Sequence, residues 1–247
     1  MTEYDEVLNA ARRLSEAEQT ALVRMLRAEL PPHPIEERLM ISAEGILESF
    51  SRAGDFTVRM IRGIFAEGAF AADVLPKLAP RWREIEVAGD PPYDFLLTDS
   101  LEDRPLDSEV VRVQVKMQRS EAGAPLRANK QWSSLVKWPA DHFVAELQKS
   151  RKGEKAGKST RPYRFGEFDI VAVSLGPSTG RWSDFTYAVA DWLLPDPDHP
   201  DQVLTYQPVS PVANDSWTRD FETAVQWFRS GQKRRIRGDI PKKGFRS

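Results

Sequence analysis

The chain has 247 residues, of which 40% are hydrophobic and 29% are charged, and it contains no cysteine. This length and apolar fraction predict one α/β domain with a helical extension, or at most two small domains. The lack of cysteine excludes disulfides, thiolate chemistry and zinc–cysteine sites. No apolar run reaches the roughly eighteen residues of a membrane span. The acidic, amphipathic N-terminus differs from a signal peptide, so we expect a cytoplasmic protein.

The formal net charge of −2 conceals two basic segments. Residues 149–164 hold seven Lys or Arg against one Glu, and residues 229–247 hold eight against one Asp, so the two segments carry +13 and the remainder −15. Clustered cations on an acidic body indicate a surface that contacts phosphates. The alternative is a solvated loop and a frayed tail, and for the tail both remain open. For the first segment we favour DNA contact, through Lys149, Arg151, Lys152, Lys155, Lys158 and Arg161.

The first 55 residues predict a helical region. Ser15-Glu16-Ala17-Glu18 has the capping-box pattern of a helix start. Leu22, Leu26 and Leu30 follow at helical spacing, and the prolines at positions 31, 32 and 34 end the helix. Packing is the default role of these helices, while a dimerisation arm and a clamp on DNA are the alternatives.

A second helix-forming segment precedes the first predicted strand. Apolar residues at positions 61, 64, 65, 74 and 75 predict a helix with one buried stripe, and Glu67 lies in its middle among small residues. Residues 82–87 alternate between apolar and charged side chains and predict a strand.

The most informative stretch runs from position 91 to position 119. Asp94 enters an apolar run, PPYDFLL, and a later run, VVRVQVKMQR, carries Gln114 and Lys116. Residues two apart in a strand point to the same face, so Gln114 and Lys116 project together and the valines between them face the other way. Two adjacent strands can therefore place Asp94, a carboxylate able to hold a metal, beside Lys116, a cation suited to activating water or stabilising a phosphate. This combination predicts a metal-dependent phosphodiesterase.

The arrangement resembles the PD-(D/E)xK nuclease superfamily, which includes most type II restriction endonucleases. Pro92-Tyr93-Asp94 stands at the family's Pro-Asp, and Gln114-Val115-Lys116 stands at its (D/E)-x-K. The departure is Gln114, an amide where most members have a carboxylate, although Mrr-like nucleases carry Q-x-K and remain active. The family has a helix before its first strand, often with a glutamate that reaches the metal. Glu67 matches that glutamate, and a surface glutamate is the equal alternative.

The later part of the chain continues the resemblance. Residues 161–173 lead into a fourth strand, and Phe185–Val189 predict a fifth; this block is similar to one in uncharacterised bacterial restriction-endonuclease-like proteins. Asp169 either adds an acidic contact near the site or, as is commoner, caps a loop or pairs with an arginine. Residues 196–211 predict a surface loop, because Pro and Asp crowd them. Residues 216–229 predict a helix that buries aromatic side chains.

The resemblance implies a restriction-endonuclease-like α/β core, with a central mixed β-sheet flanked by helices. This core covers residues 56–247, including a C-terminal helix and the basic tail, and follows the helical extension at 1–55. The implied reaction is Mg²⁺-dependent hydrolysis of DNA, with Mn²⁺ as a substitute. Asp94, Glu67 and the backbone carbonyl of Val115 would hold the metal. Lys116 would orient water or neutralise charge, and Gln114 would hold the water or the metal shell by its amide oxygen.

Three functions remain open. The preferred one is a type II-like restriction endonuclease that binds double-stranded DNA as a homodimer, so that two sites cut two strands. The second is a structure-specific or repair nuclease of the same superfamily. The third is a catalytically silent DNA-binding protein, in which Gln114, in place of a carboxylate, is a sign that the metal site has been lost. The presence of Asp94, Lys116 and Glu67 together argues against the third.

Overall fold

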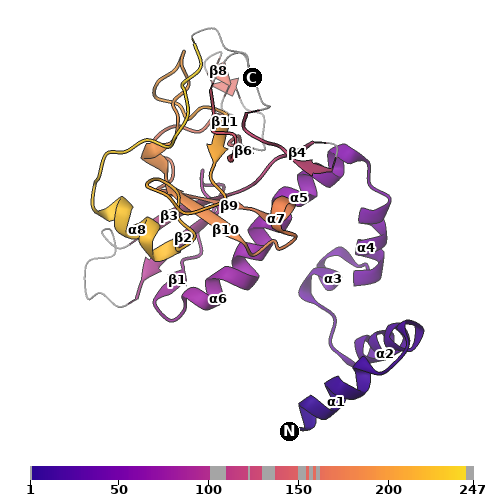
Figure 1. Ribbon diagram of the computed structural model, residues 1–247. Helices are drawn as coiled ribbons and strands as arrows, with labels where there is room; N and C mark the ends of the chain where they lie inside the picture. Colours follow the sequence, from indigo (N-terminus) through magenta and orange to yellow (C-terminus); the bar gives the residue numbers. More distant parts are fainter. Residues whose placement is uncertain are drawn as a thin grey trace. The chain divides into compact units, whose positions relative to one another are not determined.

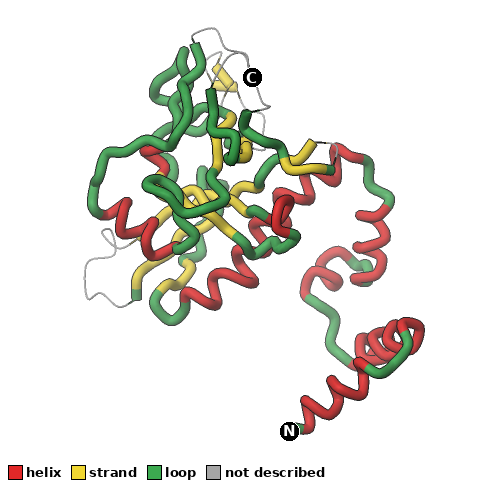
Figure 2. The backbone as a smooth tube through the Cα atoms, in the orientation of Figure 1, coloured by secondary structure: helices red, strands yellow, loops and turns green. Residues whose placement is uncertain are grey.

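The computed structural model divides into two compact units, Met1–Val58 and Arg59–Ser247. In the part of the chain that is described, all strands belong to the second unit (Figure 2). None of the described helices is long and apolar enough to cross a membrane. The structure describes residues 2–100, 110–121, 123–129, 137–149, 154–155, 158–159 and 162–242.

The first unit is helical, as predicted. The Ser15 side chain caps α2, donating from Oγ to Glu18 Oε2 over 2.6 Å and accepting from the Glu18 backbone N–H over 3.4 Å. The predicted capping box is therefore confirmed. The helix ends at Glu29, just before the prolines. The helices of this unit are α1 (Glu3–Arg12), α2 (Glu16–Glu29), α3 (Pro34–Leu39) and α4 (Ala43–Ser51).

The second unit is built on a mixed sheet of five strands in the order β1-β2-β3-β9-β10. β3 pairs in parallel with β9, whereas the other neighbours are antiparallel. All five residues of β9 and all five of β10 are buried, as expected for strands covered on both faces. The predicted mixed sheet flanked by helices is thereby confirmed. The strands are β1 (Trp82–Glu84), β2 (Phe95–Asp99), β3 (Val110–Met117), β9 (Ile170–Ser174) and β10 (Phe185–Val189).

Helical segments pack beside this sheet (Figure 1). The helix predicted around Glu67 is α5 (Asp55–Ala69), which continues through the π-helical turn η1 (Phe70–Val74) into α6 (Leu75–Leu78). Near the other end of the chain, α8 (Phe221–Arg229) contacts β9 and β10. The remaining described elements are short: β4 (Ser120–Glu121), β5 (Ala124–Pro125), β6 (Phe143–Glu146), β7 (Glu154–Lys155), β8 (Lys158–Ser159), α7 (Gly176–Thr179), η3 (Ala190–Trp192) and β11 (Tyr206–Val209).

An aromatic cluster joins the helices to the sheet. The ring of Phe70, which is fully buried in η1, lies 4.9 Å from Phe95 of β2 and 5.5 Å from Phe185 of β10. The same ring lies 6.5 Å from Phe221 of α8. Each fully buried aromatic side chain contributes about 1.5–3 kcal/mol relative to an exposed one. Phe70 therefore fixes the end of α5, and with it Glu67 one turn earlier, against the sheet.

The prediction of a surface loop over residues 196–211 is wrong in its second half. β11 pairs with β6, and Val203, Leu204 and Val209 are buried. The Asp residues at 196, 198 and 201 all precede β11, whereas Pro208 lies within this strand. Buried Gln207 bonds to backbone groups of Leu194 and so satisfies polar atoms that a pattern of turn residues does not reveal.

The last predicted helix begins later than expected, at Phe221 instead of residue 216. Asp220 caps it by accepting a hydrogen bond from the Thr223 backbone N–H over 2.9 Å. The residues before the cap are extended, because Thr218 exchanges backbone hydrogen bonds with Tyr187. Pairing with a strand has thus replaced the first turns of the predicted helix.

A buried carboxylate connects β2 to α8. Asp99 is 2% exposed and accepts hydrogen bonds from Arg81 over 3.0 Å and from Arg229 over 3.2 Å. Arg81 also pairs with Glu222 of α8 over 2.9 Å. Removing the Asp99 charge leaves two partly buried guanidinium groups without their shared counter-charge, which costs more than the loss of one hydrogen bond.

We therefore expect Asp99→Asn to lower the free energy of unfolding by about 2–4 kcal/mol, because both guanidinium groups lose their shared counter-charge. Urea unfolding at neutral pH measures this difference. The matched control is Asp201→Asn, since Asp201 pairs with Arg164 at an exposed position and should contribute less than about 1 kcal/mol. Equal losses in the two variants would contradict a role for the Asp99 cluster in holding α8.

Candidate active site

Asp94 lies just before β2 and is tied to β3 by its backbone and its side chain. Its N–H donates to the carbonyl of Val113 over 3.0 Å. Its Oδ2 accepts from the Val115 backbone N–H over 2.7 Å and from Gln114 Nε2. No residue in the described part of the chain donates to Oδ1. One carboxylate oxygen is thus anchored and the other remains available to a further ligand.

Gln114 is buried and faces Asp94 with its amide nitrogen. Nε2 donates to Asp94 Oδ2 and, over 3.2 Å, to the carbonyl oxygen of Val115. The role expected for Gln114 was to hold the water or the metal shell by its amide oxygen; toward Asp94 the side chain presents its amide nitrogen. The negative charge of a carboxylate favours a donor at this position. A half-turn about the last side-chain bond would exchange the amide nitrogen and oxygen with little change in shape.

Glu67 brings a second carboxylate to the same place. The pKa of Glu67 is raised to about 7, mainly by burial and in part by the charge of Asp94, while the charge of Lys116 opposes this rise. Desolvation also raises the pKa of Asp94, and this effect exceeds the opposing effects of Lys116 and of the hydrogen bonds to Asp94. The two carboxylates are therefore close enough to repel each other, in surroundings that do not fully compensate their charges.

Lys116 supplies the cation of the site. Burial lowers the pKa of its ammonium group, while the charges of Asp94, Glu67 and Glu146 oppose this change. Its Nζ lies 5.3 Å from the centroid of the Tyr163 ring. The structure thus brings together the four residues that the sequence motif singled out, Glu67, Asp94, Gln114 and Lys116.

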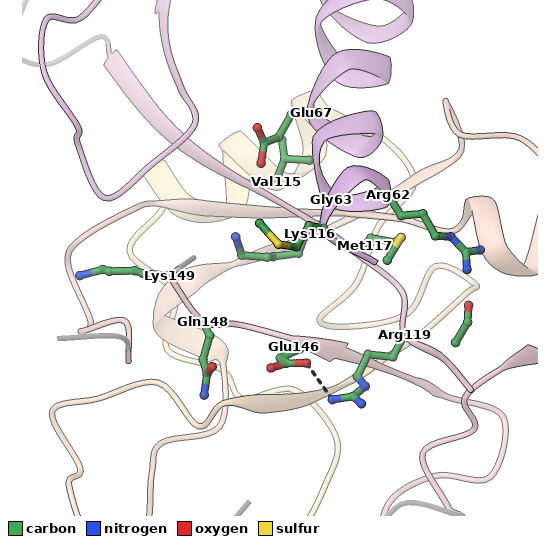
Figure 3. Close-up of a pocket in the computed structure, with 12 residues that line it drawn as sticks. Arg62, Gly63, Glu67, Val115, Lys116, Met117, Arg119, Glu146, Gln148 and Lys149 are labelled. Carbon is green, nitrogen blue, oxygen red and sulfur yellow. Dashed lines mark hydrogen bonds and ion pairs between the residues drawn. The ribbon is translucent and has the colours of Figure 1, made fainter. Parts of the chain in front are cut away.

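A pocket of about 260 Å³ opens beside these residues (Figure 3). Its walls come from α5, from β3 and the residues after it, and from β6 and the residues after it. Arg119 and Glu146, which both line the pocket, form an ion pair over 2.7 Å. The pocket is on balance positive, because its charged residues are Arg62, Glu67, Lys116, Arg119, Glu146 and Lys149.

A second pocket lies on the other side of Glu67 and has the opposite charge. Asp94 lines it together with Glu67, and further carboxylates come from Glu84, Glu86 and Asp90. Glu67 borders both pockets, so the site has a cationic side and an acidic side that meet at this residue.

The predicted DNA-binding residues are only partly covered by the structure. Lys149 lines the positive pocket and pairs with Glu167 over 2.7 Å. β7 and β8 form a short hairpin that contains Lys155 and Lys158. The residues Arg151, Lys152 and Arg161, and the side chains of Lys155 and Lys158, lie outside the described residues.

Two other acidic and basic features have structural roles. Asp169 pairs with Arg112 of β3 over 2.6 Å, which is the commoner of the two interpretations given for it. In the described part of the tail, Arg229 pairs with Asp99 and Arg237 pairs with Asp215. Ile236 is buried, so this segment packs on the domain instead of fraying.

Tyr163, Arg119 and Glu146 were not identified from the sequence, although they belong to the site. Arg119 and Glu146 meet because β3 continues beside β6, through a bridge between Gln118 and Ala145. Such long-range pairing leaves no local spacing signal. Tyr163 belongs to the block at 161–173, but a tyrosine between charged residues carries no motif of its own.

The donor set of the site suits a hard divalent cation. Asp94 Oδ1, the Glu67 carboxylate and the Val115 carbonyl are oxygen donors, and Mg²⁺ prefers oxygen and keeps several waters. No group of three or more His, Cys, Asp or Glu side chains with metal-binding geometry is found among the described residues. A cation held by two carboxylates would provide the charge compensation that Glu67 and Asp94 lack.

The raised pKa of Glu67 gives the stability of the protein a pH dependence. Between its ordinary value of 4.5 and about 7, the unfolded chain releases this proton while the folded protein keeps it. The free energy of unfolding therefore falls as the pH rises through this window. Glu67→Gln should match the wild type near pH 4 and exceed it by about 1–3 kcal/mol at pH 8. Urea unfolding at both pH values tests this, and equal stability at pH 8 would contradict it.

Comparisons with protein-family models, with curated proteins and with solved structures find no match to this chain. The resemblance to the PD-(D/E)xK nucleases therefore depends on a small set of residues and on the order of the elements that carry them. In the structure these elements are α5 with Glu67, then β1, then Asp94 just before β2, and then β3 with Gln114 and Lys116.

Proposed function

We propose that this protein hydrolyses phosphodiester bonds of double-stranded DNA with the aid of Mg²⁺. The observation that carries the proposal is the meeting of two poorly compensated carboxylates, Glu67 and Asp94, with Lys116 at the edge of a positive pocket. Strongly perturbed ionisable groups gathered at a cleft are typical of functional sites, because burying them otherwise lowers stability.

Mg²⁺ would be held by Asp94 Oδ1, by the Glu67 carboxylate and by the carbonyl of Val115, and would polarise a phosphate and lower the pKa of a water. The Val115 carbonyl has two lone pairs, so it can accept from Gln114 Nε2 and still bind a cation. The bonds from Gln114 and from the Val115 N–H would keep the Asp94 carboxylate in a fixed orientation. A fixed ligand needs no reorganisation when the substrate arrives.

Lys116 would act on the phosphate itself. A desolvated ammonium group placed beside the carboxylates can neutralise charge that develops on the phosphate oxygens, and its effect is larger there than in water. Arg119 and Lys149 on the positive side of the site would bind phosphates of the same substrate. Glu146 would orient Arg119 through their 2.7 Å ion pair.

The first candidate within this activity is a type II-like restriction endonuclease that acts as a homodimer. The charge of the second pocket favours a further candidate, a nuclease specific for ends or branches. Glu84 and Glu86 line the acidic side of the site and would repel a phosphate backbone that continues past Asp94. Closed circular plasmid and linear phage DNA, each incubated with Mg²⁺, distinguish these candidates. Cuts at discrete internal positions support restriction, and loss of linear DNA alone supports action at ends.

Replacing Lys116 should stop the reaction without unfolding the protein. Lys116→Met removes the ammonium group and keeps an unbranched apolar stem, so we expect cleavage to slow by at least about 100-fold. Single-turnover cleavage of plasmid and phage DNA measures the rate, and thermal unfolding checks the fold. Lys77→Met, at an exposed position of α6, is the matched control. Undiminished cutting by Lys116→Met would remove the nuclease assignment from this motif.

The proposed metal site predicts opposite effects at Gln114 and Asp94. Gln114→Glu replaces a donor to Asp94 by a third carboxylate, so Mg²⁺ affinity should rise on the order of tenfold. Asp94→Asn removes the central ligand, and its Mg²⁺ affinity should fall at least as much. Isothermal titration calorimetry compares both with the wild type. Unchanged affinity in both variants would show that no metal binds here, as in a catalytically silent DNA-binding protein.

A further inference from the structure

Two lysines of the site share one aromatic ring. The ammonium nitrogen of Lys116 lies 5.3 Å from the centroid of the Tyr163 ring, and that of Lys149 lies 5.4 Å from it. Lys116 belongs to β3 and Lys149 follows β6. The two side chains thus come from different parts of the sheet region and meet at the same ring. A cation within about 6 Å of an aromatic centroid is attracted by the ring, by more than about 2 kcal/mol when desolvated.

The ring itself is held firmly. Tyr163 is 4% exposed and packs edge-on against Phe168, with ring centroids 5.3 Å apart and an interplanar angle of 84°. The Tyr163 carbonyl accepts a hydrogen bond from the Val203 N–H over 2.8 Å. Burial and nearby carboxylates raise the pKa of Tyr163 far above its usual range, so the side chain stays neutral. Its attraction for the lysines therefore comes from the ring and not from a phenolate.

The ring also explains why Lys116 forms no direct ion pair with the described carboxylates around it. The charges of Asp94, Glu67 and Glu146 all act on Lys116, yet no described carboxylate lies within ion-pair distance of its Nζ. Lys149 is held from two sides, by the ring and by Glu167 at 2.7 Å. An ammonium group has three donors, so Lys149 keeps donors for a phosphate while paired. Figure 3 shows the Lys116 and Lys149 side chains extending toward the same side of the pocket.

We propose that Tyr163 is a positioning residue that holds the ammonium groups of Lys116 and Lys149 on one ring, so that they can meet two neighbouring phosphates of one nucleic-acid strand. Lys116 meets the phosphate to be cleaved, and Lys149 meets the next one along the strand. The inference rests on the proposed nuclease function. Without the ring, two flexible lysines would repel each other and lose side-chain entropy on binding, which weakens both contacts.

The experiment compares four substitutions and one combination. Tyr163→Phe keeps the ring, whereas Tyr163→Leu and Tyr163→Met keep apolar bulk without a π face, and Met serves if the Leu variant does not fold. Lys149→Met removes one cation, and the combination of Tyr163→Leu with Lys149→Met closes a double-mutant cycle. Affinity for a DNA duplex is measured over a range of salt concentrations without divalent metal. Single-turnover cleavage is then measured with Mg²⁺ at saturating DNA.

We expect Tyr163→Leu and Tyr163→Met to weaken DNA binding on the order of tenfold and to slow saturated cleavage by a similar factor. Tyr163→Phe should keep both the DNA affinity and the rate of saturated cleavage within about twofold of the wild-type values. Lys149→Met should reduce the salt slope of binding by about one. In the Tyr163→Leu background, Lys149→Met should lower DNA affinity by less than a further twofold, because Lys149 has already lost its position.

Several outcomes overturn the inference while leaving the nuclease function intact. These are cleavage by Tyr163→Leu and Tyr163→Met at the wild-type rate, equal damage from Tyr163→Phe, or additive losses in the double-mutant cycle. Conversely, coupled losses of DNA affinity in a protein that cuts no substrate would support the paired phosphate contacts and overturn the nuclease function. Wild-type protein that neither binds nor cuts DNA would overturn both.

Discussion

The register of β3 between its two neighbours is the constraint on which the site depends. Val113 lies opposite Phe95 of antiparallel β2 and opposite Ile170 of parallel β9. A slip of one residue along either neighbour would turn Gln114 and Lys116 to the opposite face of the sheet. The bond from the Asp94 N–H to the Val113 carbonyl extends the same register beyond the end of β2. The position of Asp94 relative to Lys116 is therefore set by backbone pairing and not by loop conformation.

The site that this framework carries lowers the stability of the protein. Glu67 and Asp94 repel each other in partly desolvated surroundings, and the ammonium group of Lys116 is desolvated as well. The Asp99 cluster of the same sheet behaves differently, because a buried carboxylate there is compensated by two arginines. If the charges of Glu67, Asp94 and Lys116 served only the fold, a compensated arrangement like that of Asp99 would give a more stable protein. The contrast supports a functional origin for the site of Glu67, Asp94 and Lys116.

The features that the sequence predicted are those with a local physical signal. The apolar run VVRVQVKM indicated a strand, in which Gln114 and Lys116 share a face, and Phe185–Val189 is a strand with the bounds predicted. The capping box at Ser15 was equally readable, because a cap is a matter of four consecutive residues. Each of these depends on residues within one element, so spacing alone is enough to predict it.

The features that were missed depend on contacts between distant segments. Arg119 meets Glu146 through the pairing of β3 with β6, and Tyr163 reaches Lys116 from another part of the chain. The orientation of Gln114 is also a tertiary property. Its amide nitrogen donates to the carboxylate of Asp94, a contact that spacing within β3 does not indicate. Spacing predicts which residues share a face, whereas the groups they meet there depend on the whole fold.

The same distinction limits what charge counting says about nucleic-acid binding. The tail adds strongly to the basic segments of the sequence, yet Arg229 and Arg237 are paired with acidic residues of the domain itself. A cation already paired in this way releases few counterions on meeting a phosphate, so it adds little to affinity or to its salt dependence. Lys149 is paired too, but it lines the positive pocket beside Lys116. Position relative to the carboxylates, more than the number of cations, therefore determines which basic residues can act on a substrate.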